Sequence, residues 1–156
     1  MRGKRGIELS FGMLFSILII AATIAVAFYV INYFLDLKKC TEIGLFTRDL
    51  QNKVTEAWNS DSVKDSFTGF LPGNIDKVCI GNLNLGKETE EYELLKRYKD
   101  ETANLFFYPP PKTCEIKYAN IEHAEISGFN CTLVKNGRAS LRLEKDSFDN
   151  LVKVSA

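Results

Sequence analysis

The stretch from Leu9 to Leu35 constrains this chain most, because it contains neither a charged residue nor a proline. A helix of that length measures about 40 Å, whereas the hydrocarbon core of a bilayer is ~30 Å thick. A helix of a small soluble domain would carry a polar face, and this stretch shows none. Its few polar residues are Ser10, Ser16, Thr23 and Asn32. The sequence therefore predicts a transmembrane helix over residues 9–35.

The residues on either side of this stretch predict its orientation. Arg2, Lys4 and Arg5 precede it, and short basic tails stay in the cytoplasm. All four cysteines lie beyond it, and an even number in a small domain suits an oxidising compartment. We therefore expect a cytoplasmic leader over 1–8 and an extracytoplasmic domain over 36–156, with the protein in the cell membrane as a single-pass chain.

A cleaved secretory signal is the alternative use of the apolar stretch. Ala25-Val26-Ala27 offers a small-x-small site of the kind that such signals carry. Cleavage there would leave an apolar start at 28–31, so a permanent anchor is favoured.

The helix is predicted to continue beyond the membrane stretch. Apolar residues recur at steps of three and four, and charged residues occupy the other face, which is the pattern of an amphipathic helix. The apolar positions are Cys40, Ile43, Phe46, Leu50, Val54, Ala57 and Trp58. With no proline between Ile7 and Trp58, one helix is expected, and a break at 36–39 is the alternative. Trp58 is expected to pack in the core against nearby phenylalanines.

The rest of the chain is predicted to cover the apolar face of this helix with a small antiparallel β-sheet and one extra helix, an α+β fold. We expect a loop over 59–73 and the extra helix over Glu88–Thr102. The expected strands cover 77–81, 104–108, 115–121, 131–134, 139–143 and 151–154. Asn136-Gly137 predicts a β-hairpin between 131–134 and 139–143.

The four cysteines are predicted to form two disulfides. No Cys-x-x-Cys pair is present and His123 is the single histidine, so a zinc site is disfavoured. Four cysteines allow three pairings. We favour Cys40–Cys79 and Cys114–Cys131, because the second pair joins segments that are close in sequence.

Few other residues suggest chemistry. Asn130-Cys131-Thr132 fits the acceptor pattern for N-glycosylation. His123 lies in an alternating stretch and is expected to be a strand or solvent-edge histidine. The sequence shows no nucleophile motif, paired carboxylates or phosphate-binding loop, and its net charge is zero. We therefore expect no enzyme activity, no cofactor, no metal and no nucleic-acid partner.

The segment Lys4-Arg5-Gly6-Ile7-Glu8 followed by an uncharged helix resembles the class III signal peptide of archaeal type IV pilin-like proteins. The resemblance implies that a prepilin peptidase cuts between Gly6 and Ile7 and that the helix is kept as a spine. Glu8 would be the second mature residue and a candidate assembly residue, although the commoner pattern has glutamate fifth, where Phe11 stands.

Two functions are expected from these features. The first is a pilin-like or pseudopilin cell-surface structural protein, held by membrane lipid and able to form homo- or hetero-oligomers through its N-terminal helix. The alternative is an uncut, signal-anchored protein that presents a disulfide-bonded extracytoplasmic binding domain.

Overall fold

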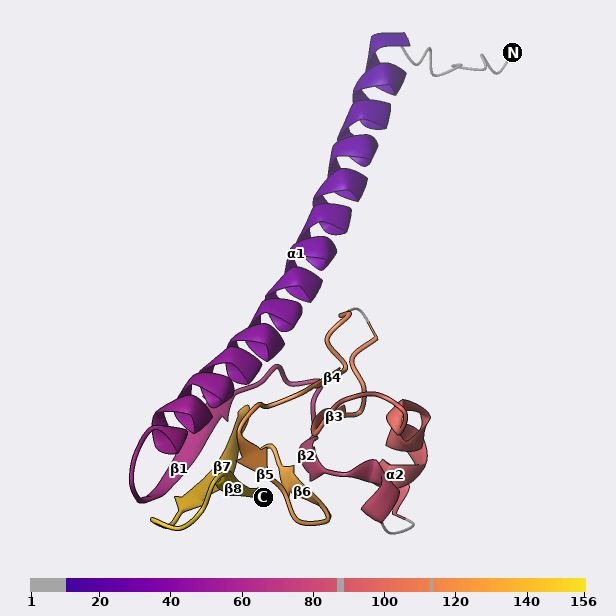
Figure 1. The fold of residues 1–156 in the computed structure, drawn as a ribbon. Coiled ribbons are helices and arrows are strands. Elements are labelled where there is room, and N and C mark those ends of the chain that lie inside the picture. Colours follow the sequence, from indigo (N-terminus) through magenta and orange to yellow (C-terminus); the bar gives the residue numbers. More distant parts are fainter. Residues whose placement is uncertain (1–10, 87–88, 113) are drawn as a thin grey trace, which may run out of the picture. The chain divides into compact units, whose positions relative to one another are not determined.

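The computed structural model describes residues 11–86, 89–112 and 114–156, and it confirms the α+β fold (Figure 1). The chain divides into two compact units, residues 1–36 and 37–156. Helix α1 (Phe11–Trp58) contributes to both units, so the break expected as an alternative at 36–39 is not found. All the strands lie in the second unit.

The second part of α1 supplies the centre of the core in the second unit. Ile43, Phe46, Leu50, Val54 and Ala57 are all at most 3% exposed, as the amphipathic pattern predicts. Phe46 makes edge-to-face contacts with two rings of the sheets, those of Phe67 at 5.3 Å and Phe107 at 6.1 Å between centroids. Gly69 lies against the same ring, and a Cβ there would come within 2.5 Å of it. This glycine therefore permits the close approach of helix and strand.

Two four-stranded sheets complete the domain. The first has the order β1-β7-β8-β5, in which β5 and β8 are parallel and the other pairs are antiparallel. Its strands are β1 (Val63–Phe70), β7 (Arg138–Lys145), β8 (Val152–Ser155) and β5 (Ala124–Glu125). The second sheet is antiparallel, with the order β4-β3-β2-β6. Its strands are β4 (Tyr118–Ala119), β3 (Leu105–Tyr108), β2 (Lys77–Gly81) and β6 (Phe129–Leu133).

Strand β1 corrects the expectation of a loop before Pro72. It pairs with β7 along its whole length, from Val63 opposite Lys145 to Phe70 opposite Arg138. Only Phe67 and Gly69 of this strand are buried, and Thr68 between them is exposed. The alternation is short and one of its inward positions is a glycine, so the apolar pattern alone did not reveal the strand.

The Asn136-Gly137 turn is present, but the predicted hairpin is wrong. Both residues have positive φ, 52° and 70°, and Lys135 and Arg138 exchange two backbone hydrogen bonds of 2.9 and 3.0 Å. Beyond this bridge the two flanking strands separate, because β6 pairs with β2 whereas β7 pairs with β1 and β8. The turn therefore connects the two sheets.

The extra helix is shorter than predicted. Helix α2 covers Glu90–Leu95 and continues as the 3-10 helix η2 (Lys96–Tyr98), and a second 3-10 helix, η1, covers Leu83–Leu85. The Thr89 hydroxyl caps α2 by accepting a hydrogen bond from the Tyr92 amide. Leu95 is its single buried residue, packed with Leu83 and Phe106 in a second, smaller core. Residues 99–102, which follow Tyr98, are polar and exposed, so burial does not favour a longer helix.

Candidate membrane anchor and disulfide-bonded domain

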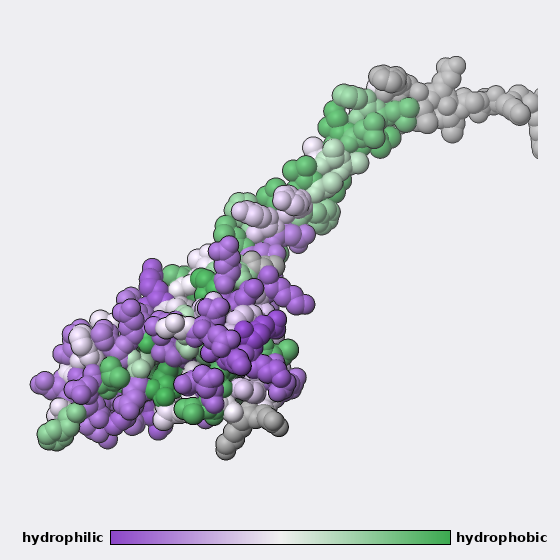
Figure 2. All heavy atoms as spheres, turned by 45° about the vertical axis from the view of Figure 1, so that its right-hand side comes forward, coloured by the Kyte–Doolittle hydropathy of each residue, from purple (hydrophilic) through white to green (hydrophobic). Residues whose placement is uncertain are grey.

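The first part of α1 is the candidate membrane anchor. Residues 12–35 are all exposed in the chain, and Figure 2 shows apolar residues covering much of this segment. Within the part of the chain that the structure describes, α1 is the one helix long and apolar enough to cross a membrane, judged by length and composition. The apolar surface of an isolated helix requires burial against lipid or other helices.

The hydroxyl groups of the anchor are satisfied within the helix itself. Ser16 Oγ donates to the Gly12 carbonyl oxygen and Thr23 Oγ1 donates to that of Ile20, both at 2.9 Å. An unsatisfied hydroxyl in hydrocarbon costs several kcal/mol, of the order of 2–7. These internal bonds therefore make both residues compatible with a bilayer. The predicted processing residues Gly6 and Ile7 and the assembly candidate Glu8 lie outside the described residues.

All four cysteines form disulfides, as expected, but the favoured pairing is wrong. The bonds are Cys40–Cys114 and Cys79–Cys131, with Cα atoms 5.3 and 3.9 Å apart. Cys79 and Cys131 are directly opposite each other on β2 and β6. Their pairing follows from the adjacency of these two strands, which closeness in sequence did not indicate.

The Cys40–Cys114 bond fixes α1 to the segment between β3 and β4. Cys40 is half-buried on the helix and Cys114 is 5% exposed, within the main core. The bond spans 74 residues, so it joins the start of the domain's helix to a point more than halfway along its remaining chain. A constraint of this length restricts the unfolded chain strongly.

The C-terminal end of α1 forms a polar and aromatic contact site that the sequence did not predict. Trp58 is 37% exposed and stacks on His123, with ring centroids 3.9 Å apart and an interplanar angle of 8°, instead of packing against phenylalanines. Its indole Nε1 donates to the Asn150 carbonyl oxygen at 3.1 Å. His123 lies in a turn with φ of 62°, not within a strand.

Lys145 of β7 closes the same end of α1. Its Nζ donates to the carbonyl oxygens of Trp58 and Ser60, each at 2.7 Å. The last turn of α1 holds no basic residue of its own. A cation supplied by the sheet therefore interacts favourably with the free carbonyls and the negative end of the helix dipole.

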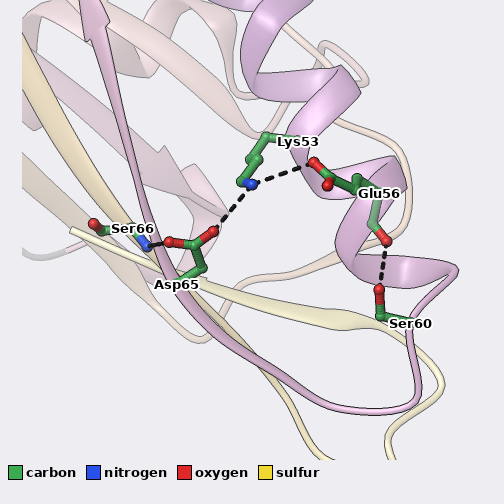
Figure 3. A network of polar contacts seen from close by, with 5 residues as sticks. All are labelled: Lys53, Glu56, Ser60, Asp65 and Ser66. Carbon is green, nitrogen blue, oxygen red and sulfur yellow. Dashed lines mark hydrogen bonds and ion pairs between the residues drawn. The ribbon is translucent and has the colours of Figure 1, made fainter.

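An ion pair fastens the side of α1 to β1 (Figure 3). Lys53 Nζ lies 3.0 Å from Asp65 Oδ2 and 3.2 Å from Glu56 Oε2, and the Ser66 amide donates to Asp65 Oδ1 at 2.7 Å. The hydrogen bond with Lys53 is the main reason that the pKa of Asp65 is lowered, and the bond with Asp65 is the main reason that the pKa of Lys53 is raised. Both side chains are partly exposed, so the pair orients the elements more than it stabilises them.

A second ion pair links β2 to α2. Lys77 donates to Glu91, whose side chain is 14% exposed. This bond, helped by the Thr89 hydroxyl, lowers the pKa of Glu91 to about 2. Burial raises the pKa of the neighbouring Tyr108, and a hydrogen bond with Glu90 raises it further. The group is a structural contact between elements, since each charge has a partner.

The described residues form no candidate metal centre. Across 11–86, 89–112 and 114–156, no three His, Cys, Asp or Glu side chains are grouped so as to hold a metal ion. The cysteines are all oxidised, so no thiol is available as a nucleophile. His123 is engaged in the aromatic stack with Trp58. The glycosylation candidate Asn130 is exposed on β6.

Comparisons of the chain with protein-family models, with curated proteins and with solved structures find no match. A long apolar helix and two disulfides fit a domain anchored in a membrane and placed on its extracytoplasmic side.

Proposed function

We propose that this protein is a pilin-like or pseudopilin structural protein of the cell surface, held in the membrane by α1 and without enzyme activity. The observation that carries the proposal is that the two parts of one helix have different surroundings. Residues 12–35 of α1 are apolar and exposed, whereas 43–57 form the buried spine of a disulfide-bonded α+β domain. A helix of this kind suits a subunit whose first part packs against lipid or neighbouring helices.

Assembly would proceed through the apolar part of α1. In the membrane this segment contacts lipid, and in an oligomer it would exchange lipid for the same segment of other subunits. Gly12 with Ser16, and Ala21 with Ala25, place small residues four positions apart, a spacing that lets helix backbones approach closely. The partners are then copies of this chain or related subunits, together with a prepilin peptidase that removes the leader.

The mature N-terminus tests this proposal. Protein purified from its native host is analysed by intact mass and N-terminal peptide mapping, alongside a Gly6→Val variant. A chain beginning at Ile7 in the wild type, with the leader kept in the variant, supports pilin-like processing. A wild-type chain that keeps its leader contradicts it and favours a single-pass, signal-anchored protein that presents a binding domain.

A further inference from the structure

Strand β6 forms an open edge of the second sheet. It is the last strand in the order β4-β3-β2-β6, so β2 is its sheet partner on one side, and no strand among the described residues pairs with its other side. The Val134 amide bonds to the Asp76 carbonyl at 2.8 Å, and the Asn82 amide bonds to the Gly128 carbonyl at 3.0 Å. The backbone N–H and C=O groups of the even-numbered residues of β6 therefore point toward β2. Those of Cys131 and Leu133 point away from β2, toward the open edge.

This open edge is also apolar. Leu133 is 55% exposed, and together with Phe129 and Cys131 it lines a groove whose other side is formed by Lys77, Leu85 and Glu91. An exposed, apolar edge strand is a site for pairing with another chain, and proteins at high local density need such an edge to be blocked. β6 contains no charged residue and no proline, the two usual devices that prevent edge pairing.

Asn130 is the second residue of β6, and its side chain is exposed to solvent. Its Nδ2 lies 3.5 Å from the Ser127 carbonyl oxygen, which is at the limit of a hydrogen bond. Thr132 follows two positions later and therefore projects from the same face of the strand. Asn130-Cys131-Thr132 is the one Asn-x-Ser/Thr pattern in the sequence, and it coincides with the edge that requires protection.

We propose that Asn130 is an N-glycosylation site and that its glycan covers the β6 edge. The donor is an oligosaccharide linked to a lipid phosphate on the extracytoplasmic side of the membrane. A bond forms between Asn130 Nδ2 and the anomeric carbon of the first sugar, while the bond from that carbon to the phosphate oxygen breaks. The lipid phosphate leaves with the electron pair, and the amide nitrogen loses one proton.

The Cys79–Cys131 disulfide determines when the glycan can be transferred to Asn130. It joins facing residues of β2 and β6, so it holds the acceptor segment extended against the sheet. A transferase must bring the asparagine amide and the threonine hydroxyl together in its own site, which a strand locked in a sheet resists. Transfer therefore precedes closure of this disulfide, and the finished domain retains a glycan on its exposed face.

The test uses the full-length chain translated in the presence of microsomes that carry an N-glycosylation system. The readout is a shift in gel mobility that an endoglycosidase removes. Asn130→Gln and Thr132→Val should abolish the shift, whereas Thr132→Ser keeps the acceptor pattern and should retain it. Thr132 is half-buried in a strand, where valine preserves both shape and β propensity.

The inference rests on the extracytoplasmic placement of the domain. A second glycosylation acceptor therefore distinguishes a domain that is not extracytoplasmic from an Asn130 that is not glycosylated. Asp61→Thr creates an Asn-x-Thr pattern at the exposed Asn59, in the connection between α1 and β1. A wild-type shift that depends on Asn130 and Thr132 supports the proposal. Modification at Asn59 but not at Asn130 overturns the glycan and leaves the placement intact. Modification at neither site overturns the placement, and the glycan with it.

Discussion

Removal of the Cys40–Cys114 disulfide should lower the stability of the domain strongly. The bond closes a loop across 74 residues. In the chain-entropy account, a loop of that length restricts the unfolded chain by about 4 kcal/mol at 25 °C. The double substitution Cys40→Ala with Cys114→Ala should therefore lower the free energy of unfolding by about this amount. Alanine is chosen because Cys114 is buried, and a serine hydroxyl there would add a separate desolvation cost.

The measurement is guanidinium unfolding of the full-length protein in detergent micelles, followed by the fluorescence of Trp58, the single tryptophan. This ring reports on the domain because it stacks on His123 and bonds to the Asn150 carbonyl. For a slope of about 3–4 kcal/mol/M, the midpoint should fall by about 1 M. Cys40→Ala alone is the matched control and should lose as much, since it breaks the same bond.

Two results would refute this reasoning. A double variant whose midpoint stays within about 0.2 M of the wild type would show that the loop constraint does not contribute as calculated. Peptide mapping of the non-reduced protein that finds Cys40 joined to Cys79, the pairing favoured by sequence, would show that α1 is fixed to a different segment.

Three further changes test contacts between elements. Glu91→Gln removes the charge that pairs with Lys77 and should lower the free energy of unfolding by about 1–2 kcal/mol at neutral pH. The loss is limited because the Lys77 and Glu91 side chains are 30% and 14% exposed, so solvent partly screens the pair. Since the pKa of Glu91 falls from 4.5 to about 2 on folding, this difference should disappear as the pH drops through that range, and a difference that persists at pH 2 contradicts it. Gly81→Ala should cost about 2–3 kcal/mol in thermal unfolding, because φ is +137° and a Cβ would lie 2.1 Å from a carbonyl oxygen; wild-type stability would contradict this. Lys145→Met should cost about 1 kcal/mol by exposing the carbonyls at the end of α1, and an unchanged midpoint would show that water replaces the lysine without loss.

Local periodicity in the sequence was enough to predict the elements whose pattern is strong. The burial of Ile43, Phe46, Leu50 and Val54 follows directly from their spacing on one helix face. Strands β2, β3 and β8 were expected because short apolar runs end at turn residues. The anchor is a property of composition alone, so it too could be predicted without knowledge of tertiary structure.

Strand β1 and the end of α1 depend on residues that are distant in sequence. Phe67 and Gly69 are the buried residues of β1, and its partner β7 lies about 70 residues further along the chain. Trp58 meets His123 because the turn before β5 is brought to the helix end by the pairing of β5 with β8. Such contacts arise from sheet order, which neither segment encodes by itself.

The disulfides show why a correct local signal produced a wrong long-range prediction. Asn136-Gly137 does form the tight turn, and a hairpin would have left Cys131 near the end of a ladder with β7. Instead, one isolated bridge, Lys135–Arg138, forms beside the turn, and β6 pairs with β2. In that pairing Cys79 is the residue opposite Cys131. Cys114 is then available to Cys40, and that bond closes onto the helix. A single choice of partner for β6 therefore determines both disulfides, and it leaves the opposite edge of β6, with Asn130, exposed.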